Sequence, residues 1–193
     1  LTAHEYFGDR AGPTEGWYSY QAGPWHVVVL NSNCTQVGGC DAASEQARWL
    51  EQDLAASSAR CTLAYWHHPR FSTGLHGSDP RTEDLWAILQ RHRAELVLAA
   101  HEHDYERFGR LDAAGAPSPT GITSFVVGTG GQAHYAPVET EGYADRRRAE
   151  VDGLVRIDDT FGVLVLDLDR EGWSSRFVDD GGTVLDRSRG TCR

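Results

Sequence analysis

The sequence predicts an α/β protein in which a parallel sheet is followed by an antiparallel one. Up to residue 100, strand-like segments alternate with helix-like segments, and this order is typical of a parallel sheet with crossover helices. Beyond residue 120, strand-like segments follow one another across turns, which favours antiparallel pairing. The 193 residues are enough for one sizeable domain and few for two. We therefore expect residues 1–193 to belong to a single domain.

Three strands and a first amphipathic helix are expected between residues 25 and 100. Trp25–Ser32 is a β-branched apolar run typical of a buried strand. The segments Cys61–His67 and Glu95–Ala100 have the same character and are expected to be its neighbours. Residues 44–56 predict a helix that Ser44 caps. Its apolar face is expected to contain three residues at helical spacing: Ala47, Leu50 and Leu54.

A second helix is expected to begin at Asp79, with Pro80 in its first turn. Its buried face is expected to contain Leu85, Ile88 and Leu89. Three later strands are expected to form an antiparallel sheet that packs beside the parallel one: 124–128, 161–167 and 173–178. Residues 169–172 are expected to form the hairpin turn between the last two.

Composition and charge argue against two classes of partner. The formal net charge is −10, whereas a nucleic-acid-binding protein needs a basic surface for phosphate contacts. The basic run Arg146–Arg148 lies among acidic residues and is expected to be a solvated loop. No apolar run approaches the roughly 18 residues of a membrane span. We expect neither a nucleic-acid nor a membrane partner, and the oligomeric state stays open.

The four cysteines predict two disulfides. Cys34 and Cys40 bracket a short loop that a disulfide can close, and Cys61 would then pair with Cys192. A cysteine metal site is the alternative, but the sequence contains no Cys-x-x-Cys spacing. Because disulfides persist in oxidising compartments, we expect a secreted or extracytoplasmic protein.

Histidines gather where predicted strands end. Five of them occupy strand ends or the loops that follow: His67, His68, His76, His101 and His103. Ligands of open α/β sheets bind beyond the carboxyl ends of the strands. On an extended segment, His101 and His103 would face the same side and could serve two ions about 3.5–4 Å apart. His67 and His68 are adjacent and would face opposite ways, so only one is expected to face the site.

Two segments resemble the late motifs of a known family. His67-His-Pro-Arg-Phe-Ser-Thr-Gly-Leu-His76 and Ala100-His-Glu-His-Asp-Tyr-Glu-Arg107 are similar to motifs of the calcineurin-like metallophosphoesterases, closest to the purple acid phosphatase branch. The stretches 17–20, 25–32 and 127–131 also resemble that branch. The resemblance implies mixed sheets in an αββα sandwich, of which residues 1–193 would be the C-terminal portion.

The resemblance also implies roles for four histidines. His67 and His101 would bind one metal ion, and His103 would bind a second. His76 would contact the substrate phosphate and protonate the leaving group, while His68 matches no ligand of the family. The implied cofactors are two divalent or trivalent ions of iron, zinc or manganese, and the implied substrate is a small phosphate ester, with monoesters as the first expectation.

The chain departs from the family pattern in two places. Ala100 stands where the family has glycine. The early motifs, which supply two aspartates and an asparagine to the metals, are not found, and no asparagine precedes His4, which we interpret as unrelated to them. We therefore expect the N-terminal half of the domain to be missing. Residues 1–193 alone are then expected to bind metal weakly and to lack activity.

Two other functions stay open. A secreted, disulfide-bonded binding or structural domain explains the cysteines and the acidic surface, although it leaves the histidines at two strand ends to chance. A phosphodiesterase or nucleotidase of the same superfamily would use the same ions as a monoesterase, so these motifs do not separate the two.

Overall fold

The computed structural model describes residues 15–135 and 154–193, and every structural statement below concerns those residues. His4 and the basic run Arg146–Arg148 lie outside them. The elements of the first half are β1 (Tyr18–Ala22), β2 (Trp25–Val29), α2 (Glu45–Ala56), β3 (Cys61–Tyr65), η2 (Pro80–Thr82), α3 (Glu83–Arg91) and β4 (Leu96–Ala99). Those of the second half are β5 (Tyr105–Leu111), β6 (Ile122–Val127), β7 (Val155–Ile157), β8 (Gly162–Leu168), β9 (Gly172–Asp179) and β10 (Val184–Thr191).

Seven strands form one mixed sheet, in the order β1-β2-β3-β4-β6-β5-β7. Its centre is parallel, because β2 pairs with β3, β3 with β4 and β4 with β6 in the same direction. The expected parallel core is therefore confirmed. β8, β9 and β10 form a separate antiparallel sheet in which β9 is central.

The assignment of residues 124–128 to the antiparallel sheet was wrong. They belong to β6, which lies beside β4 in the large sheet and runs parallel to it. The connection between these two strands contains another strand, β5, which pairs antiparallel with β6. The chain thus passes from β4 through β5 to β6, and β6 still runs parallel to β4. Strands that follow one another across turns usually pair antiparallel, so this arrangement was not predicted.

The two expected helices begin at or shortly after the capping residues that the sequence predicts. Ser44 Oγ accepts a hydrogen bond from the Ala47 amide at 3.2 Å, so Ser44 caps α2 as predicted. Asp79 accepts from the Arg81 amide at 2.9 Å, and the chain passes through the short 3₁₀ helix η2 before α3 begins at Glu83. The expected apolar faces are buried: Ala47, Leu50, Leu54, Leu85, Ile88 and Leu89.

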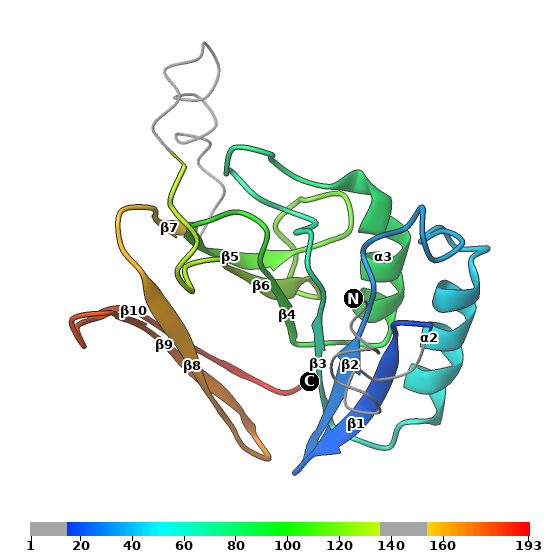
Figure 1. The fold of residues 1–193 in the computed structure, drawn as a ribbon. Coiled ribbons are helices and arrows are strands. Elements are labelled where there is room, and N and C mark those ends of the chain that lie inside the picture. The colour runs from blue at the N-terminus through cyan, green and yellow to red at the C-terminus, as the bar shows by residue number, and fades with distance from the viewer. Residues whose placement is uncertain (1–14, 136–153) are drawn as a thin grey trace.

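The described elements form three layers (Figure 1). Helices α2 and α3 cover one face of the seven-stranded sheet, and the three-stranded sheet lies on the other side. One apolar cluster joins the helices to the sheet and includes Val28, Leu50 and Trp86. A second lies between the two sheets and includes Trp25, Phe125 and Phe177. The α/β class is confirmed, and no helical layer beyond the small sheet occurs among residues 15–135 and 154–193.

Both expected disulfides are present, Cys34–Cys40 and Cys61–Cys192. The second joins the first residue of β3 to the residue after β10, and therefore ties the small sheet to the centre of the large one. In the part of the chain that the structure describes, no helix has the length and apolar character needed to cross a bilayer.

Candidate metal centre

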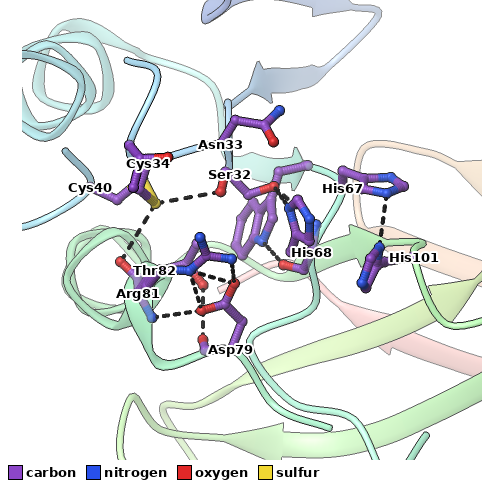
Figure 2. A network of polar contacts seen from close by, with 12 residues as sticks. Ser32, Asn33, Cys34, Cys40, His67, His68, Asp79, Arg81, Thr82 and His101 are labelled. Atoms are coloured by element: carbon purple, nitrogen blue, oxygen red, sulfur yellow. Dashed lines mark hydrogen bonds and ion pairs between the residues drawn. A yellow bond between two sulfur atoms is a disulfide. The ribbon is translucent and has the colours of Figure 1, made fainter. Parts of the chain in front are cut away.

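Two neighbouring parallel strands deliver three histidines to one edge of the large sheet. His67 and His68 follow the end of β3, and His101 follows the end of β4. Because β3 and β4 are parallel neighbours, their carboxyl ends meet at the same edge. One nitrogen from each of these three side chains lies within 4.8 Å of the other two (Figure 2). We call this group the three-histidine cluster.

His67 and His101 have the separation expected of two ligands of one metal ion. His101 Nδ1 lies 3.1 Å from His67 Nε2. Two ligand nitrogens about 2.0–2.1 Å from a tetrahedral zinc would be about 3.3 Å apart. Burial, followed by the neighbouring charges of His76 and His67, lowers the pKa of His101 and so favours the neutral imidazole that a metal requires. The donor set therefore fits a bound ion.

The expectation that only one of His67 and His68 can face the site was wrong. The ring centroids of these residues lie 5.0 Å and 4.5 Å, respectively, from that of His101. Strand β3 ends at Tyr65, so the chain has left strand geometry before it reaches His67. The alternation of side chains across a strand therefore no longer separates the two rings.

His103 lies outside the three-histidine cluster, but its tautomer suits metal binding. Its Nδ1 is 2.7 Å from the carbonyl oxygen of Ala133. Because a carbonyl only accepts, Nδ1 carries the proton and the Nε2 lone pair is left for a ligand. The ring stacks on Tyr135 with centroids 4.3 Å apart. That His103 serves a second ion stays a prediction.

The segment from His101 to His103 does not have the extended geometry that was expected. His101 has a φ of 68°, and neither residue belongs to a strand. Between them, Glu102 turns into the protein and is fully buried. The burial of this carboxylate was not expected from the sequence, because it depends on the turned backbone of this segment.

Glu102 holds His76 beside the three-histidine cluster. Its Oε1 accepts from the His76 amide at 2.8 Å and lies 3.2 Å from Nδ1 of the His76 ring. The ring itself is half-exposed, and its centroid lies 4.7 Å from that of His101. One buried carboxylate thus fixes both the backbone and the ring of His76, for which the family resemblance implies a contact with the substrate.

The Tyr-Glu-Arg part of the motif stabilises the loop that leads to His76 and also binds the small sheet. Buried Glu106 accepts from the Ser72 hydroxyl at 2.6 Å and from the Thr73 amide at 2.8 Å, just before His76. Arg107 makes a bidentate pair with Asp186 of β10, with contacts of 2.7 and 3.0 Å. These side chains position the site and do not reach into it.

Asp104 is a third buried carboxylate behind the site. It pairs with Arg156 at 2.7 Å. Burial, and after it the charge of Glu106, raise the pKa of Asp104 to about 8, although the charge of Arg156 opposes the shift. The three carboxylates are therefore part of the framework, and the three-histidine cluster contains imidazoles only among the described residues.

Gly128 is expected to be essential for the shape of this framework. A Cβ at Gly128 would lie 1.7 Å from the carbonyl oxygen of Glu102, whereas a Cβ at Gly130 would meet nothing within 4 Å. We expect Gly128→Ala to destabilise the protein by about 1–3 kcal/mol, because the backbone between His101 and His103 must move. Chemical denaturation tests this, with Gly130→Ala as the matched control. Equal effects of the two substitutions would contradict the close approach.

Comparisons with known proteins find similarity to phosphatases and to a phosphodiesterase. No protein-family model matches the chain. Purple acid phosphatase 15 of Arabidopsis thaliana is 27% identical over 139 residues, which cover 69% of this chain and 25% of that protein. Purple acid phosphatase 22 of the same plant is 27% identical over 179 residues, covering 88% and 38%. A 3',5'-cyclic-nucleotide phosphodiesterase of Nostoc sp. is 28% identical over 112 residues, covering 55% and 42%.

The fold is also shared with a solved phosphatase. The structure of purple acid phosphatase PPD1 from yellow lupin superposes with a TM-score of 0.71 at 19% identity, over 91% of this chain and 32% of the lupin chain. This chain therefore spans between 25% and 42% of the length of the curated relatives named above.

Proposed function

We propose that this chain supplies part of the active site of a metal-dependent phosphoesterase. The reason is its similarity to the purple acid phosphatases, a branch of the calcineurin-like metallophosphoesterases. The observation that carries the proposal is the 3.1 Å approach of His67 and His101 at the carboxyl edge of the sheet. The three-histidine cluster holds no carboxylate among the described residues. The remaining ligands are accordingly proposed to come from a longer protein, in which residues 1–193 are the C-terminal portion.

In this proposal His67 and His101 hold one ion, and His103 holds the other through Nε2. Imidazole ligands suit iron and zinc, whereas manganese favours oxygen ligands. When bound, such ions lower the pKa of a water nucleophile and stabilise charge on phosphoryl oxygens. The chain's own contribution is to fix the ligand rings, which it does for His103 through the carbonyl of Ala133.

His76 is proposed as the general acid. Its ring is half-exposed beside His101, and the Nδ1 side faces the buried Glu102 carboxylate. With Nδ1–H donated to Glu102, Nε2 is the nitrogen that can deliver a proton to the leaving oxygen. The Glu102 carboxylate, 3.2 Å from Nδ1, holds the ring in this orientation.

The function is tested with the full-length protein encoded by the gene, on a panel of phosphate monoesters and diesters. We expect hydrolysis that requires bound metal and that a chelator abolishes, with monoesters as the better substrates. A folded full-length protein that hydrolyses no ester on the panel, or that keeps full activity after its metal is removed, would contradict the proposal.

A phosphodiesterase is the second candidate, because one relative of this chain is named a cyclic-nucleotide phosphodiesterase. A preference for diesters in the same panel would favour it. The two disulfides support the further proposal that the protein acts in an extracytoplasmic compartment.

Glu102→Gln separates the proposed roles of Glu102 and His76. Glutamine keeps an acceptor for the His76 amide but replaces the charged carboxylate that lies 3.2 Å from Nδ1. We expect kcat to fall about tenfold or more for an alkyl phosphate, because general acid catalysis is worth about 10²–10⁴-fold. The fall should be much smaller for p-nitrophenyl phosphate, whose leaving group needs little protonation. His76→Ala should show the same dependence on the leaving group, and equal losses on both substrates would argue against the assignment.

A further inference from the structure

We propose that His68 donates a hydrogen bond from Nε2 to the phosphate group of the substrate, and that it is not a metal ligand. The inference rests on the proposed function, since it concerns the same site. It assigns a role to the one histidine of the three-histidine cluster that the family resemblance leaves without one.

The hydroxyl of Ser32 determines which nitrogen of His68 carries the proton. Ser32 Oγ accepts from the backbone N–H of His68 at 3.0 Å and lies 2.8 Å from its Nδ1 (Figure 2). Ser32 is only 1% exposed, so its hydroxyl proton needs an acceptor inside the protein. Among the described residues, the acceptor within reach is His68 Nδ1.

This hydrogen bond decides what His68 can offer the site. With its Nδ1 lone pair occupied by the Ser32 hydroxyl, the ring carries its proton on Nε2. A protonated nitrogen has no lone pair for a metal but donates well to an anionic oxygen. His68 therefore differs from His103, whose carbonyl partner leaves Nε2 as an acceptor and a ligand.

The position of the ring suits contact with a phosphate beside the metal ligands. Its centroid lies 4.5 Å from that of His101 and 4.8 Å from that of His67. The backbone is held on both sides, because the His68 amide donates to Ser32 and its carbonyl accepts from the Trp66 indole at 2.8 Å. Ser32 follows β2 and His68 follows β3, so two adjacent strands hold this ring at the edge where the ligands converge.

His68→Ala and His68→Gln in the full-length protein test the inference together. Alanine removes the donor, whereas the side-chain amide of glutamine can place an N–H near the position of Nε2. Because hydrogen bonds to charged groups are stronger than those between neutral groups, we expect His68→Ala to raise both KM for a phosphomonoester and the inhibition constant of inorganic phosphate by about tenfold or more. His68→Gln should recover much of the loss, and elemental analysis should find unchanged metal content in both variants.

Two outcomes would overturn the inference. Loss of metal in His68→Ala would show that His68 is a ligand, and unchanged phosphate affinity in a folded variant would show a purely structural role. His92→Ala is the matched control, because His92 binds Glu51 at 2.8 Å through a surface pair remote from the site. A failure of the proposed function would be seen differently, as the absence of metal-dependent hydrolysis in the unsubstituted protein.

Discussion

Replacing His101 by alanine in the full-length protein is expected to remove metal and to lower kcat for phosphate esters by more than about a hundredfold. Removing a residue that only hydrogen-bonds to a metal ligand already lowers metal affinity or activity by about 10–100-fold. Removing the ligand itself should lower them further. His101 Nδ1 lies 3.1 Å from His67 Nε2. Without the His101 ring, His67 would be left as a single nitrogen ligand. Metal content and kcat, measured on the same preparation, test this expectation.

The control for this experiment is again His92→Ala, which removes an imidazole outside the three-histidine cluster. Its ring pairs with Glu51, and such surface pairs contribute about 0–1 kcal/mol. Metal content and kcat should stay at the unsubstituted level. If His101→Ala kept its metal and its activity while remaining folded, the assignment of His101 would be wrong.

Residues 1–193 alone are expected to show negligible phosphatase activity and weak metal binding. The three-histidine cluster lacks a carboxylate among the described residues, and neutral imidazoles alone do not neutralise two divalent ions. Strand β8 is the outer strand of the small sheet, with Val163 59% exposed. An edge of this kind favours aggregation unless another segment covers it.

The measurement compares residues 1–193 with the full-length protein at equal concentration, with added zinc, manganese or iron. We expect turnover of p-nitrophenyl phosphate and stoichiometric metal only in the full-length protein. Robust turnover by residues 1–193 would contradict the view that further ligands lie elsewhere in a longer protein.

Strong local signals made the core of the fold predictable. The continuous apolar runs of β2, β3 and β4 reflect strands buried on both faces, and Ser44 marks the start of α2. Four strands were not predicted: β1, β5, β7 and β10. In β10 the inward positions include Ser188 and Gly190, and Gly190 lies against the Trp173 ring, so no apolar alternation exists to indicate a strand.

The candidate site was predictable where it depends on topology and less so where it depends on local geometry. Parallel strands guarantee that the segments after β3 and β4 meet, so the approach of His67 and His101 follows from the sequence. The inclusion of His68 and the burial of Glu102 do not, because both depend on where strand geometry ends. The positive φ of His101 is such a local feature.

The most direct test of the central claim is elemental analysis of the purified full-length protein and of its His101→Ala variant. We expect close to two ions of iron, zinc or manganese per unsubstituted chain, and the loss of at least one in the variant. A full-length protein that is folded and hydrolyses phosphate esters without bound metal would contradict the account.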